Sequence, residues 1–569
     1  MVPVQCLPLV LCLGSLIKLI VCSTEEKTTV INTSFGPIEG QQFLSEWSKQ
    51  IVYSFKGIPY ASAPVGDLRF KDPVPPKKWT QVRDCTIHGP ICPQILAMSN
   101  SETNLMDEDC LYLNVYSPQL PSQERKPALP VILWIHGGGF YKWSGNYDAY
   151  GPDLLIAEKV VMVTLNYRLG ALGFLNMDVQ DAPGNAGLKD QRLALLWIQS
   201  EIHNFGGDPH QVTIFGESAG AISAHLHYIS PISSGLFHRI IGDSGSPLAY
   251  RVREDNRHYA EELAKLLNCP HENTSKVLSC LRTAPYEDIV RAQGLVKAPQ
   301  DSKTGLNVWT PTIDKTSPSP LLPEFPYKLL KQKKDFFVPV LMGINDGEGI
   351  DRFSNQNEET IKNIINDLEY LYALQVPEAK LCPSELKAEK LRQFYFKDAS
   401  PSEVHARGYV DIYTDVLYAY GSVVNAREYQ TRSSVFVYYF TFSGRFKNEF
   451  IEQIQRKYDI SGVSHTEELN YLFINEDNRK TLEENSNEYI TRRRMVKMWT
   501  NFAKHGTPTI GPDPLLQNVH WLPAKKGGTN HLQIDVNLTM ISEDLLPHRA
   551  ALWDDITFNH CSNHFHDLL

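Results

Sequence analysis

Residues 212–220 of this 569-residue chain read VTIFGESAG. The apolar start (VTIF) predicts a short strand, and the small residues that follow (AGAISA, 219–224) predict a helix directly after it. A serine between two glycines at a strand-to-helix turn holds its hydroxyl out above the sheet, the geometry of a nucleophile elbow. Ser218 is therefore the candidate nucleophile. The pattern alone arises by chance in roughly one of five chains this long, so it needs support from elsewhere.

A second glycine-rich segment supplies that support. Residues 131–135 (VILWI) predict another apolar strand, and residues 136–140 (HGGGF) follow it. Consecutive glycines let backbone N–H groups approach a substrate and point the same way. Alone this is a flexible loop, but two such motifs in this order, each behind a strand, favour catalysis. The candidate oxyanion donors are the backbone N–H groups of Gly138, Gly139 and Ala219.

Apolar runs alternate with helical stretches along the whole chain. Strands are expected at 131–135, 160–165, 212–215, 338–342 and 435–440, and helices at 187–200, 255–267, 360–373 and 490–504. This alternation predicts an α/β fold with a large, mostly parallel central sheet and helices on both faces. No linker, repeat or low-complexity tract divides the chain, so a single domain over 24–560 is expected.

Longer motifs extend these patterns to a known family. Residues 205–220 (FGGDPHQVTIFGESAG) resemble the active-site signature of the type-B carboxylesterases, which include cholinesterases, and residues 108–115 (EDCLYLNV) resemble a second signature. Further matches lie at 57–60, 68–70, 166–168, 190–192 and 499–503. The resemblance implies the α/β-hydrolase fold, an insect-like secreted carboxylesterase, and internal ion pairs between Arg69 and Glu108 and between Arg168 and Asp190.

A serine hydroxyl is a poor nucleophile until a histidine takes its proton and an acid orients the imidazole. The chain order in this fold is serine, acid, histidine, which excludes every histidine before Ser218. His465 follows the strand expected at 435–440, and its setting, GVSHTEEL, resembles the family's histidine motif. His225 and His227 follow the elbow directly and are expected to be packing residues.

The acid is expected in residues 343–349 (GINDGEG), directly after the strand predicted at 338–342. Glu348 is the first choice, because the family carries a glutamate before a glycine at this place. Gly347 stands where relatives often have aspartate, so Asp346 and Asp351 remain alternatives.

Residues 242–247 (GDSGSP) imitate the nucleophile motif of trypsin-like proteases. Those enzymes are all-β proteins whose histidine and aspartate precede the serine, whereas this chain alternates strands and helices. The segment also resembles a non-catalytic stretch that follows the elbow in carboxylesterases. Ser244 is therefore not expected to be a nucleophile.

The chain begins with an apolar stretch, LPLVLCLGSLI at 7–17, that is too short to span a bilayer. It predicts a signal peptide at 1–23, and a short tail is expected at 561–569. Sequons predict glycosylation at Asn32, Asn273 and Asn537, which fits a secreted product. The terminal HDLL resembles a retention signal of the endoplasmic reticulum, but leucine replaces the usual glutamate, so secretion is expected.

Seven of the ten cysteines remain once the signal peptide is removed. The resemblance implies the disulfides Cys85–Cys110 and Cys269–Cys280. An odd set remains, Cys92, Cys382 and Cys561, so at least one thiol is free or intermolecular. Cys561 either links two chains or is an unpaired tail cysteine, which leaves a monomer and a disulfide-linked dimer open.

The formal net charge of −10 argues against nucleic acid as a partner. The predicted partner is a small-molecule ester, with no metal, no cofactor and no membrane span. Cholinesterases carry a tryptophan about ten residues before the second cysteine of the first disulfide loop, to bind quaternary ammonium. That position is near Asn100 here, and residues 85–110 contain no tryptophan, so choline esters are not expected.

General, xenobiotic or pheromone-type esters therefore remain as substrates. Juvenile hormone esterases typically have glutamine before the nucleophile, whereas this chain has Glu217. A juvenile hormone esterase, an interfacial lipase and a non-catalytic adhesion protein of the neuroligin type are the alternatives. The adhesion proteins usually lack the nucleophile, which this chain keeps.

Overall fold

The computed structural model describes most of the chain. The described residues are 27–95, 106–122, 128–248, 252–270, 273–296, 307–355, 358–366, 368, 385–397, 405–475, 478–479, 482–525 and 528–559. The expected signal peptide (1–23), the tail (561–569), Cys382 and Cys561 lie outside them.

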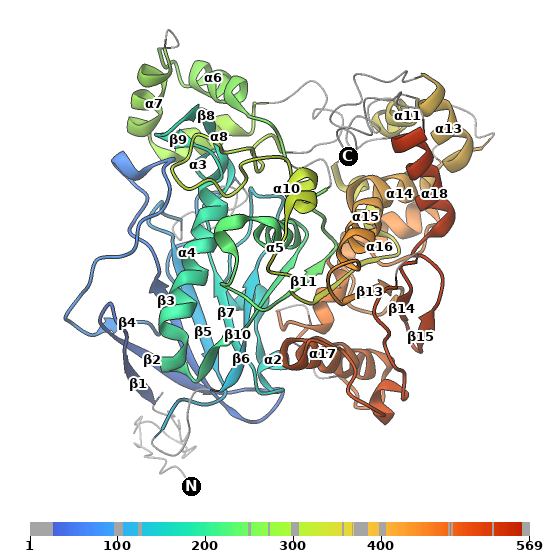
Figure 1. Ribbon diagram of the computed structural model, residues 1–569, viewed down its shortest axis with the longest axis horizontal. Coiled ribbons are helices and arrows are strands. Elements are labelled where there is room, and N and C mark those ends of the chain that lie inside the picture. Colours follow the sequence, from blue (N-terminus) through green and yellow to red (C-terminus); the bar gives the residue numbers. More distant parts are fainter. Residues whose placement is uncertain are drawn as a thin grey trace, which may run out of the picture.

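A thirteen-stranded sheet organises the described part of the chain (Figure 1). Its strand order is β1-β2-β3-β5-β7-β6-β10-β11-β12-β13-β14-β15, with β4 paired to β2. The strands from β7 to β14 pair in parallel, and the outer pairs are antiparallel except for β2 with β4. The strand bounds are β1 Thr28–Asn32, β2 Pro37–Leu44, β3 Ile51–Pro59, β4 Arg83–Asp84, β5 Tyr112–Ser117, β6 Leu129–Ile135, β7 Val161–Leu165, β10 Gly207–Glu217, β11 Arg239–Asp243, β12 Val340–Asn345, β13 Val435–Phe440, β14 His531–Ile534 and β15 Leu538–Ile541; β8 Asn176–Val179 and β9 Ala182–Pro183 form a separate pair.

Helices connect the strands and cover the sheet. Figure 1 shows α4 and α5 in front of the strands β6, β7 and β10. The helix bounds are α1 Tyr147–Tyr150, α2 Asp153–Ile156, α3 Gly170–Phe174, α4 Ala186–Glu201, α5 Ala219–Ile229, α6 Arg257–Leu266, α7 Thr274–Thr283, α8 Tyr286–Gln293, α10 Pro326–Gln332, α11 Glu358–Asn366, α13 Glu385–Tyr395, α14 Ala406–Thr414, α15 Tyr420–Tyr429, α16 Glu449–Tyr458, α17 Asn487–His505 and α18 Pro547–Asp554.

The central strands are apolar throughout because both faces of the sheet are covered. In β6, Leu133 belongs to the core on the side of α4 and α5, while the next residue, Trp134, belongs to a second core with α2 and α17. The same alternation separates Ile214 from Phe215 in β10. Successive side chains of a strand point to opposite faces, so an unbroken apolar run fills two cores at once.

These observations confirm the predicted α/β-hydrolase architecture with its large, mostly parallel sheet. Each of the five strands expected from apolar runs is present, and helices occur at the expected places; the stretch expected as a helix at 360–373 extends beyond the described residues. The ion pairs are also present, with Arg69 Nε 2.8 Å from Glu108 Oε1 and Arg168 Nε 2.8 Å from Asp190 Oδ2. No helix of the described residues is both long and apolar enough to cross a bilayer.

The expected disulfide Cys85–Cys110 is wrong. Cys110 pairs with Cys92, at a Cα–Cα distance of 5.0 Å, and Cys85 is a free, buried thiol. Cys85 directly follows β4, and its backbone is bonded to Glu39 and Lys56 at the sheet, which holds it away from the loop that carries Cys110. The pair Cys269–Cys280 is present, at a Cα–Cα distance of 5.8 Å.

Candidate active site

Ser218 lies at the sharp turn between β10 and α5. Its backbone has φ 54° and ψ −120°, an unusual conformation for a residue other than glycine, and its N–H donates to Asp243 O at 2.9 Å. A Cβ on Gly220 would lie 1.9 Å from Ile135 O, and one on Gly216 would lie 2.2 Å from the carbonyl carbon of Gly220. The two glycines are therefore required by close backbone packing, and the turn they allow fixes the serine.

The three residues expected to work together do meet. Ser218 Oγ lies 2.9 Å from His465 Nε2, and His465 Nδ1 lies 2.6 Å from Glu348 Oε2. His465 belongs to the loop between α16 and the short helix Glu467–Tyr471, and the Tyr418 ring packs on its imidazole at a centroid distance of 4.5 Å. The three side chains are arranged as a serine, a base that faces it and an acid that orients the base.

Glu348 begins a short helix (Glu348–Asn355) after β12 and is fully buried. Its Oε1 accepts hydrogen bonds from Ser244 Oγ at 2.5 Å and from Asn345 N at 2.8 Å, so its other oxygen is aimed at the histidine. Both alternative acids are engaged elsewhere. Asp346 accepts a bond from Val463 N, at 2.6 Å, and thereby positions the loop of the histidine, while Asp351 pairs with Arg352.

A third carboxyl group faces the imidazole. Glu217 Oε1 lies 3.1 Å from His465 Nε2, on the side of the serine. Burial raises the pKa of Glu217 to about 8, a rise that the neighbouring His465 opposes. Burial also disfavours the imidazolium, but attraction to Glu217 and Glu348 outweighs it and raises the pKa of His465 to about 9. Each ring nitrogen of His465 therefore faces a carboxyl group, Nδ1 that of Glu348 and Nε2 that of Glu217.

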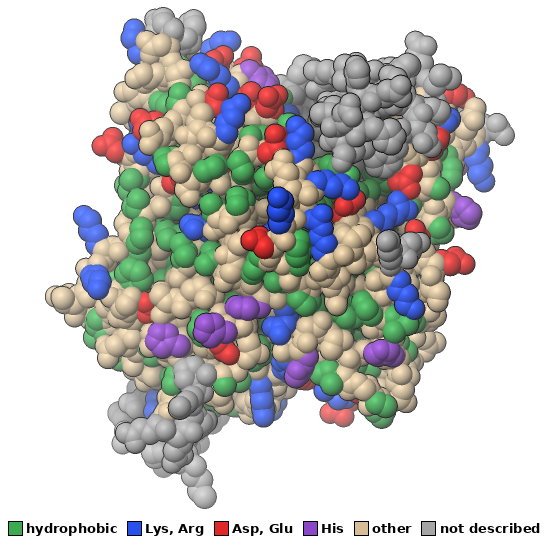
Figure 2. All heavy atoms as spheres, viewed as in Figure 1, with side chains coloured by type: hydrophobic (Ala, Val, Ile, Leu, Met, Phe, Trp, Pro, Cys, Tyr) green, Lys and Arg blue, Asp and Glu red, His purple; other side chains and the backbone are tan. Residues whose placement is uncertain are grey.

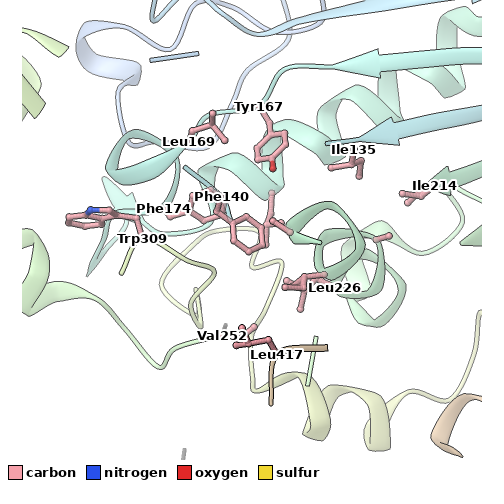
Figure 3. Close-up of a cluster of buried hydrophobic side chains, with 14 of the residues drawn as sticks. Ile135, Phe140, Tyr167, Leu169, Phe174, Ile214, Leu226, Val252, Trp309 and Leu417 are labelled. Atoms are coloured by element: carbon pink, nitrogen blue, oxygen red, sulfur yellow. The ribbon is translucent and has the colours of Figure 1, made fainter. Parts of the chain in front are cut away.

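The glycine-rich loop lies against the serine. Gly138 and Gly139 have φ values of 91° and 61°, and they line the same cavity as Ser218. Phe140 anchors the loop, because its buried ring packs on Phe174 at a centroid distance of 5.1 Å, within the cluster drawn in Figure 3. Ala219 is the first residue of α5, where helix N–H groups are free to face an anion.

The cavity above these residues has a volume of about 920 Å³. Ser218, His465, Glu217 and the two glycines form one part of its wall. Much of the remaining wall is aromatic: Tyr141, Trp143, Tyr150, Tyr418, Phe446, Phe450 and Phe473. This space accommodates a small organic molecule next to the serine.

Two neighbours of the triad were missed by sequence reasoning. Ser244 is not expected to be a nucleophile, yet it holds Glu348, and Glu217, which the sequence marks only as a difference from juvenile hormone esterases, faces the imidazole. The repetition of glycine, acid and serine at 216–218 and 242–244 was the available clue. His225 and His227 are packing residues, as expected: both are buried on α5, and burial lowers each pKa to about 3.

Known proteins share this fold and this sequence. Residues 27–553 match the carboxylesterase family. Esterase B1 of Culex pipiens is 34% identical over 497 residues (85% of this chain and 90% of that protein), and the juvenile hormone esterase of Tribolium castaneum is 34% identical over 521 residues (88% and 87%). The crystal structure of juvenile hormone esterase from Manduca sexta, with OTFP covalently attached, superposes with a TM-score of 0.79 at 26% identity and covers 93% of this chain and 99% of its own.

The family match extends over the strands, the elbow and the loops that bring Ser218, Glu348 and His465 together. The chain therefore belongs to the carboxylesterase family and is a serine carboxylic ester hydrolase.

Proposed function

We propose that Ser218, His465 and Glu348 hydrolyse carboxylic esters through an acyl-enzyme. The observation that carries this proposal is the unbroken chain of contacts from Ser218 Oγ through both imidazole nitrogens to Glu348. An activated serine next to a cavity of molecular size has the parts that acyl transfer needs.

Ser218 Oγ attacks the ester carbonyl while His465 Nε2 takes its proton. Glu348 stabilises the imidazolium through Nδ1–H, and the imidazolium then gives its proton to the leaving alcohol. A water molecule, activated by the same nitrogen, hydrolyses the acyl-enzyme and restores the serine. Every proton that moves passes through Nε2, which faces Ser218 at 2.9 Å.

The backbone N–H groups of Gly138, Gly139 and Ala219 stabilise the oxyanion of the tetrahedral intermediate. The positions of these residues support this role. Gly138 and Gly139 lie beside the serine in the cavity wall, and Ala219 begins α5. Losing one such donor costs about a hundredfold to a thousandfold in turnover in comparable enzymes.

The protein acts outside the cell after removal of residues 1–23. The exposed positions of Asn32, Asn273 and Asn537 are compatible with glycosylation at the predicted sequons. Residues 24–560 then form a single domain. The protein is a disulfide-linked dimer if Cys561 pairs with its copy in a second chain, and a monomer if Cys561 is unpaired. Mass spectrometry of the secreted protein, with and without glycosidase and reductant, tests the cleavage, the glycosylation and the disulfide-linked dimer.

The substrates are general esters of xenobiotic or pheromone type. Residues 92–110, the loop that the first disulfide closes, contain no tryptophan, which disfavours choline esters. Juvenile hormone hydrolysis is the second candidate, favoured by the two similar juvenile hormone esterases. Glu217 in place of their typical glutamine argues against it.

The decisive experiment compares the wild-type protein with Ser218→Ala on short-chain and long-chain esters, acetylthiocholine and juvenile hormone. We expect hydrolysis by the wild type that Ser218→Ala abolishes while its circular dichroism and melting temperature stay unchanged. A fluorophosphonate should add one adduct, on the peptide that contains Ser218. Undiminished turnover by a folded Ser218→Ala variant would falsify the proposal.

A further inference from the structure

Among the described residues, basic side chains are as numerous as acidic ones in the cavity wall, although the whole chain carries a formal net charge of −10. Four basic side chains line it: Lys142, Arg352, Arg445 and Lys447. On the face of the molecule that Figure 2 shows, basic and acidic side chains are interspersed. An excess of one sign in a concave site focuses the field on what enters.

Within the part of the chain that the structure describes, three of these four cations have no anionic partner. Arg352 pairs with Asp351, but among the described residues no carboxylate oxygen lies within 4.0 Å of the charged nitrogens of Lys142, Arg445 or Lys447. Lys447 Nζ donates to the neutral amide of Gln455 at 2.9 Å. These three side chains therefore keep their charge available to a ligand.

Aromatic rings hold two of the cations without neutralising them. Lys142 Nζ lies 5.6 Å from the centroid of the Trp143 ring and 5.7 Å from that of Tyr141, and the Arg445 guanidinium lies 5.7 Å from that of Phe446. A ring attracts a cation through its quadrupole but carries no net charge. Tyr141, Trp143 and Phe446 belong to the same cavity wall.

The carboxyl groups of the wall do not balance the three cations. Of the four that line the cavity, Asp351 is paired with Arg352 and Glu217 faces His465. Burial raises the pKa of Glu467 to about 8, although Lys447 opposes the rise, so this group is mostly protonated at neutral pH. Among the described residues of the wall, Asp148 remains as the one exposed carboxylate.

The cations are fixed relative to the reacting serine. Lys142 follows the oxyanion glycines in one turn, and its N–H donates to Gly138 O at 3.2 Å. Arg445 and Lys447 come from the segment between β13 and α16, and Arg445 N donates to Glu488 Oε1 at 3.3 Å. Two separate parts of the chain thus bring positive charge to one cavity.

We infer that the esterase prefers esters that carry an anionic group, such as a carboxylate, away from the scissile bond, and that Lys142, Arg445 and Lys447 bind this group. The inference rests on the proposed function and names its substrate class. The reaction is unchanged: water cleaves the ester, and the anionic group passes into the acid or the alcohol product.

Two matched ester pairs test the inference. The acyl pair is para-nitrophenyl octanoate and the para-nitrophenyl half-ester of octanedioic acid; the alcohol pair is the butyrates of para-ethylphenol and of para-hydroxyphenylacetate. We expect the anionic member of at least one pair to have a kcat/KM about tenfold higher at low salt, the lower end of what a focused field gives. The advantage should shrink from about 0.01 M to about 0.15 M salt, where the Debye length falls from about 30 Å to about 8 Å.

Variants assign the preference to the named side chains. Lys142→Met and Arg445→Gln should each lower the ratio of anionic to neutral kcat/KM severalfold. Arg493→Gln is the matched control for Arg445, because the Arg493 guanidinium also lies over a ring, 5.8 Å from the Tyr489 centroid, but does not line the cavity. Lys265→Met, on the exposed side of α6, is the control for Lys142.

Equal or lower activity on the anionic member of both pairs overturns the inference, as does a ratio that Lys142→Met and Arg445→Gln leave unchanged. An equal loss for both members of a pair also overturns it, because it indicates a structural rather than a charge effect. Failure of the proposed function is distinct: the neutral esters would then not be hydrolysed, or Ser218→Ala would hydrolyse them as fast as the wild type.

Discussion

Two neighbouring strands of the sheet end in nearly the same sequence. β10 ends in Gly216-Glu217 and β11 in Gly242-Asp243, these residues are register partners, and a serine with φ 54° follows each strand. Ser218 is 8% exposed and contacts the histidine, whereas Ser244 is 0% exposed and contacts the acid. The same local backbone geometry thus gives the two serines different roles, because different side chains lie opposite their hydroxyl groups.

The acids that precede the two serines differ in the same way. Glu217 faces His465, while Asp243 accepts a hydrogen bond from Trp499 Nε1 at 3.3 Å. Burial raises the pKa of both carboxyl groups. Their positions within the sheet are equivalent, so the difference between them comes from the loops and helices that the chain places above each strand.

The largest expected effect separates the two serines directly. Ser218→Ala should lower kcat by about a millionfold, the loss found when a nucleophile is removed from a serine hydrolase triad. Labelling by a fluorophosphonate should disappear at the same time. Labelling that persists in Ser218→Ala and vanishes in Ser244→Ala would reverse the assignment.

The second expected effect concerns Glu348. Ser244 contacts this acid directly, and Ser218 is linked to it through His465. Glu348→Gln keeps the size of the side chain but removes the charge that stabilises the imidazolium, so kcat should fall about ten-thousandfold. Steady-state kinetics on para-nitrophenyl butyrate measure it. Asp346→Asn and Asp351→Asn serve as comparisons, and a larger loss in either would indicate a different acid.

The third effect tests whether Ser244 positions the acid. Ser244→Ala removes one hydrogen bond to a carboxylate, worth about 1.5–3 kcal/mol, which corresponds to a loss of about tenfold to a hundredfold in kcat. KM should change little, and the fluorophosphonate should still react at Ser218. Full activity in this variant would leave Ser244 with a packing role only.

The smallest expected effect is a shift in pH dependence. His465 must be neutral to accept the serine proton, so activity is lost as pH falls through its pKa, which its carboxyl neighbours raise to about 9. We expect the acidic limb of the kcat/KM profile above the ordinary value of about 6.5. Glu217→Gln removes one neighbour and should move this limb down by about one pH unit.

Asp243→Asn is the control for this shift, because Asp243 occupies the equivalent register position but is bonded to Trp499. The acidic limb of the kcat/KM profile of Asp243→Asn should lie at the same pH as that of the wild type. A limb that moves upward in Glu217→Gln would show that Glu217 does not stabilise the imidazolium.

Motifs with local causes could be predicted from the sequence. The elbow follows from glycines that tight backbone packing requires, and the strands follow from apolar runs that both faces of a parallel sheet bury. Glu348 could be predicted as a candidate because it follows a strand, and both Glu348 and His465 because their settings resemble those of the family. The disulfide partner of Cys110 could not be predicted, because both Cys85 and Cys92 precede it in the chain. Only the packing of Cys85 at β4 shows that Cys92 is the partner.

The sequence by itself determined the parallel sheet, the turn that carries Ser218 and the family, because these depend on residues adjacent in the chain or on periodicity. Only the tertiary structure showed that His465 reaches both Ser218 and Glu348, that Ser244 holds this acid, and which cations share the cavity. These depend on contacts across 104 to 247 residues of chain, where small differences in how loops pack over neighbouring strands select the partner.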